Sequence, residues 1–81
     1  MAKEKQQMSF SSFYADQGSI FDAWKDNQGS AHLEIRSNGS VVYTGTFYNA
    51  NALAKQIRLN TKKKKKVVAV LSRGKDRLTI S

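Results

Sequence analysis

The alternation of apolar and polar positions predicts two β-hairpins in the second part of the chain. In "AHLEIRSNGSVVYTGTF", residues 31–47, two alternating runs flank Asn38-Gly39. This dipeptide between alternating runs is the strongest short-range signal for a hairpin. The last segment, "VVAVLSRGKDRLTIS", residues 67–81, has the same form around Gly74. The pattern therefore predicts four strands after residue 30.

The loop length of the first hairpin decides which side chains it displays. A two-residue turn sets Ile35 opposite Val42 and Leu33 opposite Thr44. The other face then carries His32, Glu34, Arg36, Val41 and Tyr43. A three-residue loop with a glycine bulge instead pairs Ile35 with Val41 and Leu33 with Tyr43, and leaves Arg36, Val42 and Thr44 outside. Tyr43 is displayed in the first register and buried in the second.

The second hairpin has one favoured register. A two-residue turn that begins at Gly74 puts Leu71 opposite Leu78 and Ala69 opposite Ile80, and Arg73 then meets Asp76 beside the turn. The run 67–71 is apolar on both faces. We therefore expect it to form a central strand.

A short helix is expected between the hairpins, in "YNANALAKQIRLN". Asn49 is a suitable N-cap. A single face, within about 100° of arc, carries Ala50, Leu53, Ala54 and Ile57. Leu59 lies outside this stripe, so the helix should end near Asn60.

The N-terminal third is harder to assign. Residues 1–7 are polar, and we expect a loose tail. In "MSFSSFYADQGSIFDAWKDNQG", residues 8–29, the aromatic residues fall near helical spacing, but Gly18 interrupts it, and two short strands fit as well. We favour a strand over residues 20–25.

The expected fold class is α+β. We expect one domain, residues 8–81, with a small antiparallel sheet (a meander and a C-terminal hairpin) packed on one short helix.

Charge is concentrated at the end of the sequence. The chain has 81 residues and a net charge of +8. Up to Ala52 it holds four Lys or Arg against five Asp or Glu, and from Leu53 onwards ten against one.

The sequence has no cysteine, which excludes disulfides and thiolate zinc sites. Without an apolar stretch long enough for a signal peptide or a membrane span, we expect a cytoplasmic protein, or a nuclear one in a eukaryote or a eukaryotic host.

Catalytic chemistry has little support in the sequence. His32 is the only histidine, and the six carboxylates form no spaced set for acid–base work or metal binding. The glycines in "SNGS" and "SRGK" fit turns rather than a phosphate-binding loop. We expect no enzyme activity, no metal site and no cofactor.

The lysine run at residues 62–66 has three interpretations. It can be a solvated connector, a contact for nucleic acid, or a docking site for an acidic protein or anionic lipid. We favour nucleic acid, DNA before RNA, held through its phosphates. The expected phosphate contacts are Lys62, Lys63, Lys64, Lys65 and Lys66, extended by Lys55, Arg58, Arg73 and Lys75. Arg36 and Tyr43 are the candidates for contact with bases. Stacking planes could come from Trp24, Tyr43, Phe47 and Tyr48. Because a small domain needs aromatic residues in its core, we expect Phe47 to be buried and Tyr43 and Tyr48 to be displayed.

A resemblance to a known family supports this interpretation. The order strand, strand, strand, helix expected over residues 21–58, with "EIR" at 34–36, "GTF" at 45–47 and the alanine-rich helix from Asn49, resembles the plant ethylene-response-factor type of DNA-binding domain, which phage integrase N-terminal domains share in fold. The resemblance implies a sheet face in the DNA major groove, with Arg36 and Tyr43 at contact positions. Val41 and "FDAWKD" lack the arginines of that family.

A second class of function fits the same composition. A small regulatory or inhibitory protein, of the phage or mobile-element type, would dock on an acidic or nucleic-acid-handling host protein. A free sheet edge would also allow two copies to pair as a homodimer.

Overall fold

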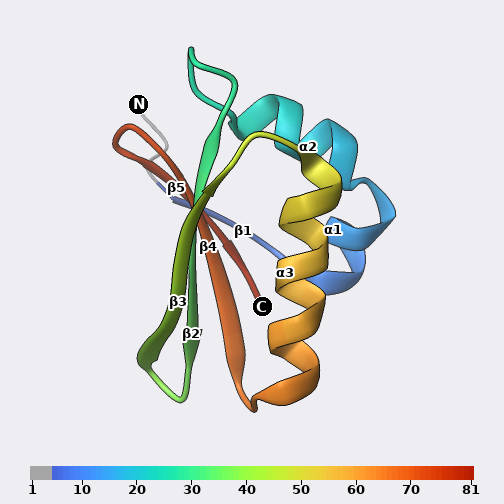
Figure 1. Cartoon of the computed structure of the whole chain (residues 1–81), viewed down its shortest axis with the longest axis vertical. Coiled ribbons are helices and arrows are strands. Elements are labelled where there is room, and N and C mark those ends of the chain that lie inside the picture. Colours follow the sequence, from blue (N-terminus) through green and yellow to red (C-terminus); the bar gives the residue numbers. More distant parts are fainter. Residues whose placement is uncertain (1–4) are drawn as a thin grey trace.

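Residues 5–81 fold into a five-stranded mixed sheet with three helices on one face (Figure 1). The computed structural model describes residues 5–81. Its elements are β1 (Lys5–Met8), α1 (Phe10–Ala15), α2 (Gln17–Trp24), β2 (Ala31–Ser37), β3 (Ser40–Phe47), α3 (Ala50–Lys63), β4 (Val67–Arg73) and β5 (Asp76–Ile80). The strand order is β1-β5-β4-β2-β3. The expected α+β class is confirmed, but the sheet is not purely antiparallel and three helices pack on it, not one.

The parallel strand is β1, where we expected part of a loose tail. Lys5 pairs with Arg77 and Met8 with Ile80 along β5. The Ser81 N–H also donates to the Met8 carbonyl, 3.1 Å away, and the Met8 side chain packs against the core. Backbone pairing and one apolar side chain thus order residues 5–7, whereas residues 1–4 lie outside the described part of the chain.

The prediction of a strand over residues 20–25 is wrong, because residues 20–24 belong to helix α2 and Lys25 is its C-cap. The Ser9 hydroxyl accepts a hydrogen bond from the Ser12 N–H and caps α1. The aromatic side chains recur at helical spacing, so Phe13, Phe21 and Trp24 are all buried under the sheet. The order over residues 21–58 is therefore helix, strand, strand, helix, and the first strand required by the family resemblance is absent.

The Asn38-Gly39 turn has the expected two residues. Asn38 and Gly39 have φ values of 55° and 84°, as a type I′ turn requires. A bulge follows, because Arg36 pairs with Val41 whereas Ile35 pairs with Tyr43, which leaves Val42 as the extra residue. The two-residue register therefore holds only as far as the pair of Arg36 and Val41, and the partners predicted for Ile35 and Leu33 are wrong in both registers.

The C-terminal hairpin has the predicted register. Leu71 pairs with Leu78, Ala69 with Ile80 and Arg73 with Asp76. Its first strand, β4, lies between β5 and β2, which confirms the expected central position.

The helix after the first hairpin begins as predicted but ends later. The Asn49 side chain accepts hydrogen bonds from the N–H groups of Asn51 and Ala52, at 2.8 and 3.2 Å. The helix continues past Asn60 to Lys63. Lysine is a good helix former, and its charge is favourable at the negative end of the helix dipole. The first two residues of the lysine run are thus helical.

The core lies between the helices and one face of the sheet. It contains Phe13, Phe21, Trp24, Ala31, Leu33, Ile35, Leu53, Ala54, Ile57, Ala69, Leu71, Leu78 and Ile80. None of the described helices lies on the opposite face of the sheet (Figure 1). No helix in the described part of the chain is long and apolar enough to cross a membrane.

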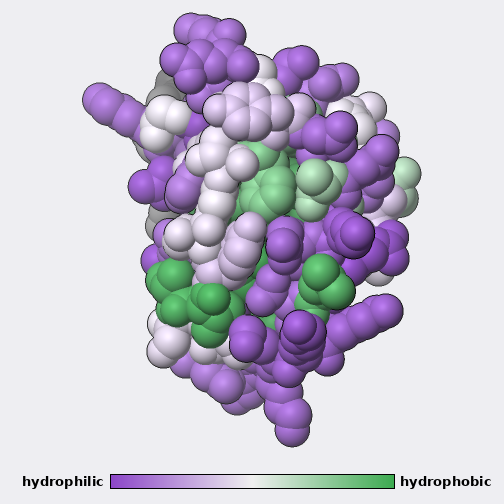
Figure 2. Space-filling view, viewed as in Figure 1, coloured by the Kyte–Doolittle hydropathy of each residue, from purple (hydrophilic) through white to green (hydrophobic). Residues whose placement is uncertain are grey.

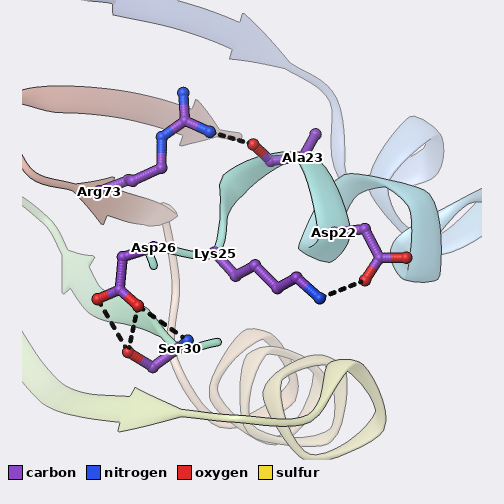
Figure 3. Close-up of polar contacts among 6 residues, drawn as sticks. All are labelled: Asp22, Ala23, Lys25, Asp26, Ser30 and Arg73. Atoms are coloured by element: carbon purple, nitrogen blue, oxygen red, sulfur yellow. Dashed lines mark hydrogen bonds and ion pairs between the residues drawn. The ribbon is translucent and has the colours of Figure 1, made fainter. Parts of the chain in front are cut away.

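The loop between α2 and β2 is closed by Asp26 (Figure 3). Its carboxylate accepts hydrogen bonds from the backbone N–H groups of Gln28 and Ser30 and from the Ser30 hydroxyl. These bonds hold the pKa of Asp26 below its usual value, the Ser30 N–H being the largest cause.

Candidate nucleic-acid interface

Three basic side chains form a stripe along one flank of α3. Positions three, four and seven residues apart lie on the same side of a helix, and this spacing joins Lys55, Arg58 and Lys62. We call these three residues the α3 basic stripe. They line a groove of about 300 Å³ together with Gln17 of α2 and Asn51, Ala54 and Leu59 of α3. The Gln17 amide donates to the Asn51 side chain and closes one side of it.

The cations of the α3 basic stripe have no acidic partner among the described residues. The ion pairs found there join Lys25 to Asp22, Arg36 to Glu34 and Arg73 to Asp76. All three residues of the stripe are exposed. Their charge is therefore not compensated within residues 5–81 and is open to an external anion.

The lysine run continues this charge beyond the end of α3. Lys62 and Lys63 form the last turn, and the Lys64 N–H donates to the Asn60 carbonyl, 3.0 Å away. Lys65 and Lys66 then connect α3 to β4. Hydrophilic side chains are gathered over this lower end of the molecule in Figure 2.

The backbone of the connector is held against the β2–β3 turn. The Ser37 hydroxyl donates to the Lys65 carbonyl at 2.7 Å, and the Asn38 N–H donates to the Lys66 carbonyl at 3.4 Å. Lys66 has a φ of 52°, in the left-handed region that a residue with a side chain seldom adopts. The connector is therefore a fixed bend whose lysine side chains remain directed to solvent, except for the half-buried Lys64.

Two aromatic residues of α1 lie next to this basic surface. The Arg58 guanidinium carbon is 4.2 Å from the centre of the Tyr14 ring, and the Phe10 and Tyr14 ring centres are 6.1 Å apart at an interplanar angle of 21°. Both rings line a hollow of about 260 Å³ whose other walls are Thr61, Lys64, Lys66 and Val67. Phe10 and Tyr14 were not among the site residues expected from the sequence. Helical spacing at Phe10, Phe13 and Tyr14 was the signal that could have placed them beside α3.

Arg73 does not belong to this surface. It lies over the Trp24 ring at 4.8 Å, forms an ion pair with Asp76 and donates a hydrogen bond to the Ala23 carbonyl (Figure 3). Arg73 and Lys75 are also separated from the lysine connector by the length of β4, roughly 20 Å for seven residues. The expectation that they widen the lysine patch is wrong, because the strand places them at the opposite end of the molecule.

Arg36 and Tyr43, the expected base contacts, lie on opposite faces of the sheet. Arg36 is on the face without helices and pairs with Glu34. Tyr43 packs against the core on the helix side, so the expectation that it is displayed is wrong. The bulge explains this position, and Gly45 makes room for it, since a Cβ there would lie 3.0 Å from the Tyr43 hydroxyl. Of the two tyrosines expected to be displayed, Tyr48 is 68% exposed.

No cluster of three or more His, Cys, Asp or Glu that would bind a metal ion occurs in residues 5–81. His32 lies on the open face of the sheet, where its Nδ1 is 3.3 Å from the Thr46 hydroxyl. No family model, no curated protein and no solved structure matches this chain.

Proposed function

We propose that the protein binds nucleic acid without catalysing a reaction, DNA in preference to RNA, and that it does so through phosphate contacts. The contacts are the α3 basic stripe and the lysines at 62–66. One observation carries the proposal. These cations form a continuous series along one flank and the C-terminal end of α3, and the described residues form no ion pair with them. Lysine and arginine in such an arrangement exchange condensed counterions for phosphates.

The binding mode should be insensitive to sequence. Flexible ammonium groups position a phosphate backbone but do not read base edges. The residues expected to contact bases do not join the surface, since Tyr43 is packed on the core and Arg36 lies on the other face of the sheet. Affinity for different sequences of the same length should thus be similar.

Fluorescence anisotropy of labelled oligonucleotides tests the proposal with two variants of equal charge. The first replaces Lys55, Arg58 and Lys62 by glutamine. The control replaces Lys25, Lys75 and Arg77 by glutamine, and none of these three lies on α3 or in the lysine run. Each removes three positive charges from the net +8. We expect the first variant to reduce the slope of log K against log salt by about 2 to 3, and the control to change it by less than about 1. Equal losses in both would mean that net charge, not this surface, binds the ligand.

A second candidate function rests on the free edge of the sheet at β3. No charged residue occurs from Ser37 to Ala54, although charged residues make up 25% of the chain. Val41 and Val42 are exposed on this edge strand, and Figure 2 shows a band of neutral and apolar atoms over β3. Natural edge strands are usually blunted by charge, and an uncharged one is a template for a partner's strand.

This second candidate, a regulatory protein that docks by strand addition, is tested by placing a charge on the edge. The occupant that can be examined directly is a second copy of the chain. Sedimentation of the protein at about 100 µM should show a dimer that Thr44→Lys abolishes and Thr79→Lys, on an inner strand, retains. A monomer at this concentration would exclude self-pairing.

A further inference from the structure

The hollow between α1 and the end of α3 combines two kinds of chemistry. We call it the α1 aromatic pocket, lined by Phe10, Tyr14, Thr61, Lys64, Lys66 and Val67. Two aromatic residues of α1 and two lysines of the run at 62–66 thus line the same hollow. The hollow is small, about 260 Å³, and opens to solvent. It lies beside the α3 basic stripe, because Arg58 of the stripe is placed over the Tyr14 ring.

The two rings are placed differently from the aromatic residues of the core. Phe13 is 0% exposed and Phe21 is 5% exposed, so both are fully used in packing. Phe10 and Tyr14 pack against the core with part of their surface and remain half-exposed. The core of this small domain therefore does not account for the open side of these rings.

Arg58 adds a cation whose donors are free. Its guanidinium makes no side-chain hydrogen bond to a described residue, and its position over Tyr14 limits the conformations that it samples. A guanidinium held in this way loses little freedom when it binds a phosphate through two N–H groups. Lys64 and Lys66 supply further charge at the other side of the pocket.

Aromatic planes between cations fit the unpaired bases of single-stranded nucleic acid. Each nucleotide carries a base with two apolar faces and, one sugar away, a phosphate. An aromatic ring can therefore stack on the base while a neighbouring ammonium group contacts the phosphate. In a duplex the base faces are covered by neighbouring bases, and only an unstacked base can enter such a pocket.

We propose that the α1 aromatic pocket binds a nucleobase of single-stranded nucleic acid by stacking on Phe10 and on the part of the Tyr14 ring that Arg58 does not cover, while the adjacent phosphates contact Arg58, Lys64 and Lys66. This inference rests on the proposed function and narrows its ligand from nucleic acid in general to single strands. The strand follows the flank of α3 from Lys55 to the lysine connector.

Affinity measurements separate stacking from charge. The variant Phe10→Leu/Tyr14→Leu keeps apolar volume and all charges but removes both rings. We expect its affinity for single-stranded oligothymidylate to fall about 5-fold to 100-fold, while its weaker affinity for a duplex of the same length is unchanged. Tyr14→Phe, which retains the ring, should behave like the parent protein. The matched control is Tyr48→Leu, because Tyr48 is the most exposed aromatic residue and follows the β3 edge. Circular dichroism and thermal melts establish that each variant is folded.

Photochemical cross-linking locates the base directly. Oligothymidylate that contains 5-iodouracil forms covalent adducts with aromatic side chains stacked on it. We expect adducts in the peptide that contains residues 10–15, and their loss in the Leu variant. Equal affinity for single and double strands with no adduct in this peptide would overturn the inference and leave the phosphate proposal intact. Absence of any nucleic-acid binding at 50 mM salt would overturn both.

Discussion

Two arginines stack on aromatic rings in this protein, but their surroundings give them different roles. Arg73 lies over Trp24 and also bonds to the Ala23 carbonyl and to Asp76, so its hydrogen-bonding capacity is used within the fold. Arg58 lies over Tyr14 and makes no side-chain hydrogen bond among the described residues. Both residues look alike in the sequence, because the burial and the partners of a side chain are set by tertiary structure.

Replacing each of these arginines by glutamine should separate stability from binding. Arg73→Gln removes a hydrogen bond to a backbone carbonyl, a cation–π contact and a partly exposed ion pair, and we expect a loss of about 1–2 kcal/mol in the free energy of unfolding. Nucleic-acid affinity should change little. Arg58→Gln should weaken binding with a stability change below about 1 kcal/mol. Urea unfolding and anisotropy on both variants measure this difference, and a reversed order would contradict the assignment of the two roles.

Asp26 should make the stability of the protein depend on pH in the acid range. Hydrogen bonds from the Ser30 and Gln28 N–H groups keep its pKa in the folded protein below the usual value of 3.8. The unfolded chain therefore binds the proton more readily, and the stabilisation from Asp26 is present above pH 4 and lost as the pH falls through its folded-state pKa.

Asp26→Asn tests this linkage. Urea unfolding between pH 5 and pH 3 should show a smaller fall in the free energy of unfolding for the variant than for the parent protein. An identical fall in the two proteins would show that Asp26 does not contribute to the acid sensitivity.

Among the helices and strands, the features that depend on neighbouring residues were predicted from the sequence pattern. The register of the β4–β5 hairpin follows from the two-residue turn at Gly74 and from the apolar pairs that it creates, and the structure has the same pairs. The start of α3 follows from the cap residue Asn49.

Elements that depend on distant partners were not predicted. β1 has the sequence "KQQM", which contains no strand pattern, and it is a strand because β5 pairs with it from the other end of the chain. The bulge at Val42 was also missed, since three adjacent apolar residues, Val41 to Tyr43, give the pattern no preferred register. The α1 aromatic pocket depends on α1 and α3 packing together, and the basic stripe alone was visible in the sequence.

Asn49→Ala should destabilise the protein by about 1 kcal/mol, because two N–H groups at the start of α3 lose their acceptor. Asn49→Asp, which retains the acceptor, is the matched control and should remain close to the parent protein. Thermal or urea unfolding measures both. A loss in Asn49→Asp as large as that in Asn49→Ala would show that the cap is not the cause.

For the whole molecule, the sheet separates surfaces of different character. The described part of the helix layer carries the uncompensated cations of α3 and its lysine connector, whereas β3 presents an uncharged edge. The ion-paired arginines Arg36 and Arg73 lie outside the helix surface formed by α3. Net charge alone does not reveal this arrangement. Under the proposed function, the arrangement would direct a polyanion to the flank formed by α3.

The salt dependence of binding tests most directly whether the flank formed by α3 engages phosphates. Anisotropy titrations of a labelled single-stranded oligonucleotide and of its duplex at several salt concentrations from about 50 to 200 mM give the slope of log K against log salt. With five phosphates engaged, the slope should be about −3.5 for the single strand and about −4.5 for the duplex. A slope near zero, or no binding at the lowest salt concentration, would contradict phosphate binding by this flank.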